Sequence, residues 1–448
     1  MAALEEMILW DKEHLVHTDC PVGQNIGVVF VKGKGVMVED AEGNEYFDLC
    51  SQLDCVSLGY GQTELVAAAS EQMEKLPYST TFFGFSHVPF MKCGMKLAEL
   101  TPEGLDAFFF NSGGSESNET AFKLARTYWA RQCLGKYKII SLYGSYHGSA
   151  SCTGGASGIG KGHMLAGLNP PAPGFLHIPP YYCYRCMFGK KYPECGIQCA
   201  QYLGDAIANE GADTVAAFIA EPVIGAGGMI PPPPEYWPMV REICSAYNVL
   251  LIADEVKTGF CRTGKMFATE HWGIEPDIMT MAKGISSSYF PVGAVAFTQE
   301  IHETIKGEEF TGFTYDGHPV GLALTLKAME IYERDHIAER AASAGEYLLK
   351  RLEEEFASIP CVGEISGLGL MAGMEIVADK DTKEMFDPSM KVVDKLREDT
   401  LKNGLNLRIA GLGYQMTDRV MFGPPLIITQ QEIDRSIAIL KPIIEKIH

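Results

Sequence analysis

The sequence is poor in basic residues. It has 37 Lys and Arg against 57 Asp and Glu, and its formal net charge at pH 7 is −20. No dense run of Lys or Arg offers a local basic patch, and a chain of this charge repels the phosphate backbone of DNA or RNA. Nucleic acid is therefore excluded as a partner.

Long apolar runs and an export signal are also missing. No stretch approaches the roughly 18 uninterrupted apolar residues of a membrane-spanning helix. The first residues, MAALEEMILWDKEHL, are acidic where a signal peptide is basic. Thirteen cysteines spread over a large chain fit free thiols in a reducing compartment better than a disulfide framework. The sequence thus predicts a cytoplasmic protein that does not bind membranes.

Repeats of fixed period and long linkers are absent as well. The 448 residues are 46% hydrophobic and 21% charged, which is ordinary for a globular protein and excludes an intrinsically disordered chain. At roughly 150 residues per domain, this length predicts two or three domains. An enzyme-sized globular protein is the expectation.

The middle of the chain alternates short apolar runs with helical stretches. Residues 117–132, for example, carry apolar side chains at the spacing of one helix face. Runs that are apolar on both faces, separated by helices, are typical of a mainly parallel sheet covered by helices. The predicted fold class is therefore α/β. The predicted strands are Leu105–Phe110, Lys138–Leu142, Val215–Ile219, Val249–Ala253, Ile278–Met281 and Val292–Phe297.

The pattern changes in the last third of the chain. Long helices are predicted at Leu322–Arg334 and His336–Phe356, and a strand pair follows them. The last helix should begin near Thr429, which has capping-box spacing to a glutamate. The hairpin-like segment VKGKGVMVEDAEGNEYFDL near the start of the chain is assigned to the same smaller part. The predicted domains are a large one at residues 61–325 and a smaller α+β domain built from residues 1–60 and 326–448.

Most of the predicted strands lead into glycine-rich or polar segments at their carboxyl ends. In an open parallel sheet, ligands bind outside that edge. We therefore expect these segments to form one site for an anionic, aromatic and electrophilic cofactor. They are the turn Gly113–Ser115, Tyr146 with His147, Glu221, Asp254 and Lys283.

Each of these residues also has an ordinary structural interpretation. The Gly113–Ser115 turn brings backbone N–H groups to an anion at the positive end of a helix, or it is a plain tight turn. Asp254 can hold a pyridine nitrogen protonated, or it caps a helix. Tyr146 can stack on a ring and His147 can position a carboxylate or water, or both are ordinary buried side chains. Lys283 on its own is a lysine that leaves a strand.

Six segments together carry a resemblance. They are SGGSESNETAFKLAR, SYHG, EPVIGAGG, ADEVKTGFCRTG, MAKGISSSYFPVGAV and FTYDGHPVG, in this order over most of the chain. This set resembles the class III aminotransferases, which are fold-type I pyridoxal-phosphate enzymes. The resemblance implies a seven-stranded type of sheet domain that binds pyridoxal 5′-phosphate.

The resemblance also implies roles for particular residues. Lys283 would carry the cofactor as a Schiff base, and Thr314 would reach the cofactor phosphate of a neighbouring subunit. This second role implies a homodimer or a dimer of dimers. The remaining implied cofactor contacts are Gly114 and Ser115 on the phosphate, Tyr146 and Val256 on the two ring faces, His147 nearby, Asp254 on the pyridine nitrogen and Glu221 beside it.

The implied substrate contacts are Arg408, Asp54 and Phe83. Arg408 matches the arginine that grips the carboxylate of the acceptor, and its planar fork suits bidentate binding. Asp54, in SQLDCVSLGYG, falls where amine-pyruvate and taurine-pyruvate members usually have a tryptophan. A carboxylate there predicts a preference for donors with a distal cationic or neutral polar group, unless Arg408 neutralises it. Asp54 facing solvent or pairing with a backbone amide is the alternative.

The implied reaction transfers an amino group from an amine or omega-amino acid donor to a keto acid, pyruvate or 2-oxoglutarate, in a ping-pong cycle. Three other reactions stay open on the same scaffold: those of a racemase, an aminomutase and a decarboxylase. Which of them occurs depends on the bond that is held perpendicular to the cofactor ring.

Four cysteines have a spacing close to that of zinc ligands: Cys183, Cys186, Cys195 and Cys199. The intervening segment MFGKKYPE is short for a zinc ribbon, and free buried thiols are common. No metal is assigned to the active site. A structural metal, or a metal-bearing or thiol-regulated binding protein, stays the alternative from a different class.

Overall fold

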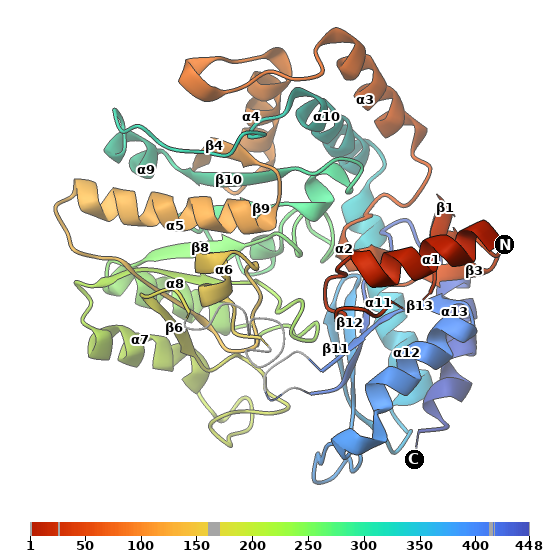
Figure 1. Ribbon diagram of the computed structural model, residues 1–448. Helices are drawn as coiled ribbons and strands as arrows, with labels where there is room; N and C mark the ends of the chain where they lie inside the picture. The colour runs from red at the N-terminus through yellow and green to blue at the C-terminus, as the bar shows by residue number, and fades with distance from the viewer. Residues whose placement is uncertain (1, 26, 160–170, 412–414, 416, 448) are drawn as a thin grey trace.

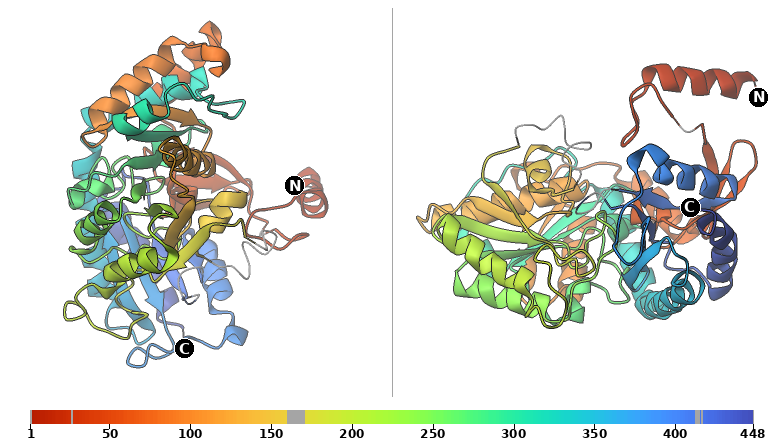
Figure 2. Two further views of the ribbon diagram at one scale, coloured as in Figure 1. Left: turned by 90° about the vertical axis from the view of Figure 1, so that its left-hand side faces the viewer. Right: turned by 90° about the horizontal axis from the view of Figure 1, so that it is seen from below.

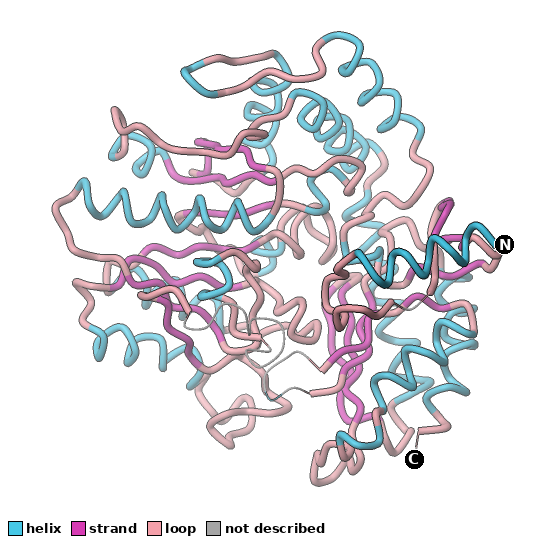
Figure 3. The backbone as a smooth tube through the Cα atoms, in the orientation of Figure 1, coloured by secondary structure: helices cyan, strands magenta, loops and turns pink. Residues whose placement is uncertain are grey.

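The computed structural model describes residues 2–25, 27–159, 171–411, 415 and 417–447. A large sheet with its covering helices lies beside a smaller group of strands and helices (Figure 1). The strands form two separate groups, one in each of these two parts (Figure 3). Helix α1 (Ala2–His14) stands away from the rest of the molecule (Figure 2).

The large sheet has seven strands in the order β4-β10-β9-β8-β7-β5-β6. Strand β10 runs antiparallel between β4 and β9, and the other neighbours pair in parallel. The mainly parallel α/β sheet predicted from the sequence is therefore confirmed. Its strands are β4 (Leu105–Asn111), β5 (Lys138–Leu142), β6 (Phe175–Ile178), β7 (Val215–Ala220), β8 (Leu250–Asp254), β9 (Ile278–Met281) and β10 (Gly293–Thr298).

Helices cover both faces of this sheet because its strands are apolar on both sides. In β10, Val295 packs in one core with α5 (Gly114–Arg131), whereas Ala296 faces the core around α10 (Pro319–Arg334). The other helices near the sheet are α3 (Thr63–Lys75), α4 (Val88–Leu100), α6 (Ser151–Ala156), α7 (Gln198–Glu210), α8 (Tyr236–Ala246) and α9 (Gln299–Thr304), with short 3₁₀ turns η1 (Phe82–Gly84), η3 (Ala268–His271) and η4 (Lys283–Ser286).

The smaller part contains segments from both ends of the chain. Strand β3 (Glu45–Asp48) pairs in parallel with β13 (Leu405–Asn406), which joins the two ends in one sheet. The division predicted at residues 60 and 325 stays a prediction, and residue 325 falls inside α10, which packs on the large sheet. The other elements here are β1 (Phe30–Lys34), β2 (Met37–Asp40), α2 (Ser51–Asp54), α11 (Ile337–Phe356), β11 (Val362–Leu368), β12 (Met371–Ile376), η5 (Pro388–Met390), α12 (Val392–Lys402), β14 (Arg408–Ala410), β15 (Arg419–Phe422) and α13 (Gln430–Ile444).

The capping box predicted at the last helix is present. Thr429 Oγ1 accepts the Glu432 N–H at 3.3 Å, and Glu432 Oε2 accepts the Thr429 N–H at 2.8 Å. Of the large-sheet strands, the sequence missed only β6, a four-residue strand whose burial is mostly partial. Within the part of the chain that the structure describes, no helix is both long and apolar enough to span a bilayer.

Candidate active site

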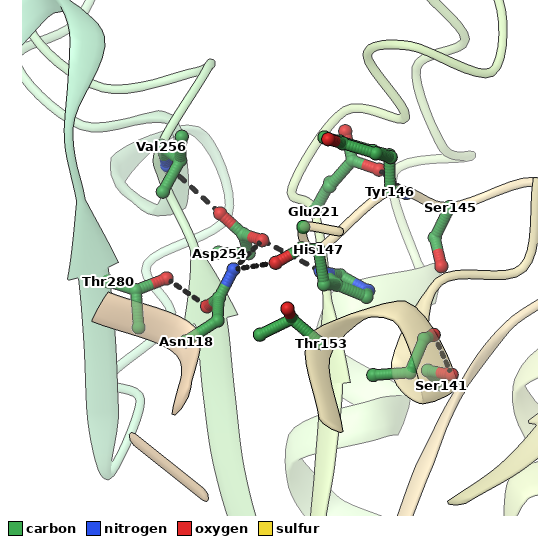
Figure 4. Close-up of polar contacts among 12 residues, drawn as sticks. Asn118, Ser141, Ser145, Tyr146, His147, Thr153, Glu221, Asp254, Val256 and Thr280 are labelled. Carbon is green, nitrogen blue, oxygen red and sulfur yellow. Dashed lines mark hydrogen bonds and ion pairs between the residues drawn. The ribbon is translucent and has the colours of Figure 1, made fainter. Parts of the chain in front are cut away.

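Asp254, at the carboxyl end of β8, is fixed by hydrogen bonds from three directions. The Val256 N–H donates to Oδ1 at 3.1 Å, and Oδ2 accepts Asn118 Nδ2 at 2.8 Å and His147 Nδ1 at 2.7 Å. These donors converge on one carboxylate between β8 and the N-terminal part of α5 (Figure 4). The side chains of His147 and Asp254 are 0% and 3% exposed, so this carboxylate is held rigidly in a dry site.

A second set of contacts orients the groups that hold Asp254. Thr280 Oγ1 donates to Asn118 Oδ1 at 2.8 Å, so the amide nitrogen of Asn118 turns toward Asp254. The His147 N–H donates to Ser157 Oγ at 2.9 Å, and His147 Nε2 is buried without a hydrogen-bond partner in the described residues. Neither Asn118 nor Thr280 was predicted from the sequence. Asn118 lies about one helical turn after Ser115, and that spacing is a usable signal.

Glu221, at the end of β7, positions the loop that carries Tyr146. Its Oε1 accepts the Tyr146 N–H at 2.9 Å, and its Oε2 accepts the Gly225 N–H at 2.7 Å. Burial raises the pKa of Glu221. The His147 ring opposes this rise, and the nearby Asp254 carboxylate adds to it. A second carboxylate thus lies beside Asp254, as the resemblance implied.

The N-terminus of α5 forms a cradle for an anion. No side chain caps the helix at Gly113, so its first N–H groups have no partner within the helix. A Cβ at Gly114 would lie 2.7 Å from Val256 Cγ1, and at Gly113 it would meet nothing within 4 Å. Glycine at 114 therefore lets the helix end approach the loop after β8. This geometry fits a phosphate group.

Lys283 occupies a strained position two residues after the end of β9. Its φ is 48°, in the left-handed region that non-glycine residues rarely adopt. Such a residue costs of order 1–3 kcal/mol, and this cost is typical of functional positions. Behind it, a Cβ at Gly284 would lie 2.9 Å from Phe260 Cβ. Tight packing therefore holds the lysine in place at the edge of the sheet.

Most of the residues singled out from the sequence line one cavity of about 260 Å³. Its size suits a small molecule and not a polymer. The cavity combines an anion-binding helix end, a fixed carboxylate, an aromatic face and a lysine. This set of groups fits an anionic aromatic cofactor with an electrophilic group. The lining includes Gly114, Ser115, Tyr146, His147, Glu221, Asp254, Val256, Lys283 and Arg408, with Leu53, Asn118 and Lys257 in addition.

Three residues singled out from the sequence do not line this cavity. Thr314 lies in an exposed segment, where its carbonyl accepts the Tyr78 hydroxyl at 2.7 Å. Phe83 is 91% exposed. Asp54 is 2% exposed and lies behind the lining. Within a single chain, then, the cavity has neither the Thr314 nor the Phe83 contact.

Asp54 neither faces solvent nor pairs with a backbone amide. Its Oδ2 lies 2.8 Å from Lys257 Nζ, and the two side chains are 1% and 5% exposed. The neutralising cation expected from the sequence was Arg408, and Lys257 was not predicted. Burial works to raise the pKa of Asp54, but the neighbouring cations, Lys257 first, hold it below its ordinary value. The expectation of a free carboxylate on the cavity wall is therefore corrected.

The backbone around Asp54 is strained. Ser51, Gln52 and Asp54 have φ of 43°, 60° and 59°, and each such position costs of order 1–3 kcal/mol. Asp48 Oδ2 stabilises the segment by accepting the Gln52 N–H at 3.0 Å. The result is that Leu53 turns toward the cavity while Asp54 turns inward.

The four closely spaced cysteines line a separate small cavity of about 20 Å³ and are free thiols. Burial raises the pKa of Cys199 to about 12 and that of Cys183 to about 11, so both are neutral thiols when no metal is bound. Among the residues with described positions, no group of three or more His, Cys, Asp or Glu is arranged to hold a metal ion.

Known proteins resemble this chain over nearly its whole length. A putrescine–pyruvate aminotransferase of Pseudomonas aeruginosa is 39% identical over 93% of this chain and 90% of its own length. The gamma aminobutyrate transaminase 1 of Solanum lycopersicum, described as mitochondrial, is 36% identical over 92% of this chain and 80% of its own length. An (S)-enantioselective omega-transaminase from Thermomicrobium roseum, a solved structure, superposes with a TM-score of 0.92 at 41% identity and covers 97% of both chains.

The family model for aminotransferase class-III matches residues 20–444. That span includes all the cavity-lining residues named above, and it leaves out only the two ends of the chain. The six sequence blocks that carried the resemblance lie within it. This chain is therefore a member of the class III aminotransferases, a family that uses pyridoxal phosphate.

Proposed function

We propose that this protein binds pyridoxal 5′-phosphate and transfers an amino group from an amine or omega-amino acid donor to pyruvate or 2-oxoglutarate. One observation carries the proposal: Asp254, the N-terminus of α5 and Lys283 line a single cavity at the carboxyl edge of the sheet. The relatives support the reaction class, since their names cover putrescine, gamma-aminobutyrate and pyruvate as substrates.

Each residue of the site has its own role in the proposed reaction. When bound, pyridoxal phosphate supplies an electron sink that stabilises negative charge on the substrate carbon. The first N–H groups of α5 would hold the phosphate, Asp254 would accept the ring N–H, and Lys283 would be the residue that binds the cofactor covalently. Tyr146 and Val256 would contact the ring, and His147 orients Asp254. Lys283 Nζ would also be the group that moves the proton at the substrate carbon.

Arg408 completes the proposed site on the substrate side. It lies in β14, in the smaller part of the molecule, and lines the cavity opposite the large sheet. A guanidinium there binds the carboxylate of the keto acid in a bidentate manner. The acceptor is thus held between the two parts of the chain.

Purified protein loaded with pyridoxal phosphate should convert pyruvate or 2-oxoglutarate into the matching amino acid, mole for mole with the donor consumed. This stoichiometry separates transamination from the alternative reactions, because a racemase, an aminomutase or a decarboxylase leaves the keto acid unchanged. Chromatographic quantification of the keto acid and of the new amino acid is the measurement. Loss of the donor without a gain of amino acid argues for one of the alternatives.

We further propose a homodimer, or a dimer of dimers, in which Thr314 completes the phosphate site of the neighbouring subunit. The support is its exposed position outside the cavity, beside a surface rich in exposed aromatic and apolar side chains. Exposed apolar groups of this extent mark interaction surfaces. Besides Phe83, they are Tyr78, Phe82, Phe85, Val88, Met91, Met95 and Tyr315. Phe83 would enter the substrate site from the partner side.

Mixing two defective variants tests this composite site. Lys283→Ala and Thr314→Trp should each be nearly inactive, because each lacks one part of every site. After equal mixing and subunit exchange, about a quarter of wild-type activity should return, since half of the dimers hold one intact site. Light scattering should show a dimer or a multiple of it. If no activity returns after subunit exchange, Thr314 does not complete the site of the neighbouring subunit.

A cytoplasmic location is the proposed setting. All thirteen cysteines are free thiols in the structure, and free thiols persist in a reducing compartment. Fractionation of the source cells, with the activity followed through each fraction, tests this location.

A further inference from the structure

Asp48, at the carboxyl end of β3, is a fully buried carboxylate that does not line the cavity. Both of its oxygens accept the Gln52 N–H, at 3.1 and 3.0 Å. Oδ1 also accepts Asn406 Nδ2 at 3.0 Å, and Oδ2 accepts the Tyr60 hydroxyl at 2.6 Å. A buried charge is costly unless hydrogen bonds satisfy it. These neutral donors therefore hold the carboxylate in place.

The charged groups near Asp48 have other partners. Arg262 lies close enough to interact with Asp48 electrostatically, but its guanidinium donates to the Pro424 carbonyl. Asp54, in the same segment, is paired with Lys257 at 2.8 Å. Asp48 thus acts through its hydrogen bonds, and these join two segments of the cavity wall.

The first of these segments is α2, which carries Leu53. Ser51 and Gln52 have φ of 43° and 60°, a conformation that costs of order 1–3 kcal/mol for each residue. The bonds from the Gln52 N–H to Asp48 offset this cost at one end of α2, and the ion pair of Asp54 anchors the other end. Leu53 lies between the two anchors and lines the cavity. Its position therefore depends on Asp48.

The second segment leads from β13 into β14 and carries Arg408. Asn406 is paired with Asp48 in the parallel ladder of β13 and β3. After β13 the chain leaves this sheet, because β14 belongs to the sheet of β11, β12 and β15. Asn406 is thus the last residue paired with β3, two residues before Arg408, which lines the cavity. One carboxylate therefore holds the segments of both Leu53 and Arg408.

We propose that Asp48 is a positioning residue for both substrates, because it holds Leu53 and Arg408 in a fixed relative position at the substrate side of the cavity. The inference rests on the proposed aminotransferase reaction, in which the donor and the keto acid enter the same cavity in turn. The proposed cofactor contacts come from the large sheet and its loops and do not depend on Asp48. Its loss should therefore weaken the binding of both substrates and leave the bound cofactor in place.

Steady-state kinetics of the holoenzyme with putrescine and pyruvate test this role. Asp48→Ala should raise both KM values together, each by about tenfold or more, the effect of losing hydrogen bonds to a buried charge. The kcat should stay within about threefold of wild type, since only binding shared by ground state and transition state is lost. Arg408→Ala, in contrast, should raise KM mainly for pyruvate, because putrescine has no carboxylate.

Asp40→Ala is the matched control, because Asp40 is a buried carboxylate of the same sheet with the same kinds of donor. It accepts two backbone N–H groups, an asparagine amide and the Tyr46 hydroxyl, away from the cavity. Its loss should leave both KM values unchanged. Tyr60→Phe and Tyr46→Phe form a milder pair if Asp48→Ala does not fold. Of these two, only Tyr60→Phe should raise both KM values, by about threefold, the effect of one lost hydrogen bond.

An exchange of the two side chains tests the link between the segments. Asn406→Asp alone brings two carboxylates together, whereas adding Asp48→Asn removes that repulsion and restores a bond between positions 48 and 406. The double variant should therefore have lower KM values than Asn406→Asp alone. Damage that simply adds up in the double variant is the result expected of two independent structural defects, and it contradicts the inference.

Hydrogen exchange gives a readout that does not depend on turnover. In Asp48→Ala, amide exchange should become faster by about tenfold at residues 51–54 and also at residues 405–410, with no change at residues 112–118 of the proposed phosphate site. Asp40→Ala should change none of the three segments. Faster exchange in only one of the two wall segments, or unchanged KM values for both substrates, overturns the inference. If wild type has no aminotransferase activity but both wall segments respond, the proposed function fails while the coupling through Asp48 stands.

Discussion

Lys283→Ala should lose the covalently held cofactor and nearly all turnover, with kcat reduced by at least about 10⁴-fold, since both the nucleophile and the proton-transfer group are removed. Among the described residues, Lys257 is the one rival, because it lines the same cavity. Its ammonium is engaged by Asp54 at 2.8 Å, whereas Lys283 lies two residues after the end of β9. We therefore expect Lys257 not to substitute.

Absorbance and mass spectrometry separate these two lysines. Wild type should show the visible band of lysine-bound pyridoxal phosphate, and borohydride reduction should fix the added mass on the peptide that contains Lys283. Lys283→Ala should lose both signals, and an added small amine should restore a little turnover by replacing the missing base. Lys136→Ala serves as the control for loss of a buried lysine. A reduced adduct on Lys257 in the Lys283→Ala variant would show that the assignment is wrong.

The large sheet was predictable because its strands are buried on both faces. Continuous apolar runs such as Ile278–Met281 have the length of a strand and no helical period, and the strand was found at those residues. Strand β6 was missed because Phe175–Ile178 is mostly only partly buried. Its pattern therefore lacks the signal of the central strands.

The topology of a parallel sheet predicts at which edge of the sheet the candidate site lies. Parallel strands end at the same edge, so Glu221, Asp254 and Lys283 had to lie close together whatever their roles. Partners that come from a helix or from the other part of the chain had no such signal. Asn118 contacts Asp254 from α5, and Lys257 meets Asp54 across the boundary between the two parts.

Asp54 shows why a charge in a sequence is hard to interpret alone. Its effect on the cavity depends on which cation lies beside it, and Lys257 is about 200 residues away along the chain. The strained backbone of α2, with positive φ at Ser51 and Gln52, is what turns the carboxylate inward. No local sequence rule predicts three such φ values in non-glycine residues.

Asp254→Asn should keep the fold and the bound cofactor but lower kcat by about 10² to 10⁴-fold, the range for loss of one electrostatic or proton-holding group in a site. An amide has nearly the shape of the carboxylate, so the packing around β8 is retained. It carries no negative charge, however, and therefore does not stabilise a protonated ring nitrogen. The electron sink weakens while the phosphate and lysine contacts stay.

The hydrogen bonds around Asp254 predict a second effect of this substitution. All the contacts to its two oxygens come from donors: the Val256 N–H, Asn118 Nδ2 and His147 Nδ1. An amide offers one acceptor and one donor, so in either orientation its NH₂ group meets at least one of these donors. With the NH₂ group at the position of Oδ2, His147 accepts its N–H at Nδ1 by moving its own proton to Nε2, which has no partner in the described structure. With the NH₂ group at the position of Oδ1, it meets the Val256 N–H and His147 keeps its tautomer. The tautomer of His147 should therefore report which orientation the amide takes.

Three measurements check the substitution together. The amount of bound cofactor should stay near that of wild type, kcat should fall, and NMR of the His147 ring nitrogens should report the tautomer and so the orientation of the amide. Asp277→Asn is the matched control, because Asp277 precedes β9 at the opposite edge of the sheet, where it accepts the Leu251 N–H at 2.6 Å and Arg241 Nη1 at 2.9 Å. That variant should lose stability without a comparable loss of kcat. A near-normal kcat in Asp254→Asn, with cofactor bound, rules out the role proposed for Asp254, since the negative charge has been removed.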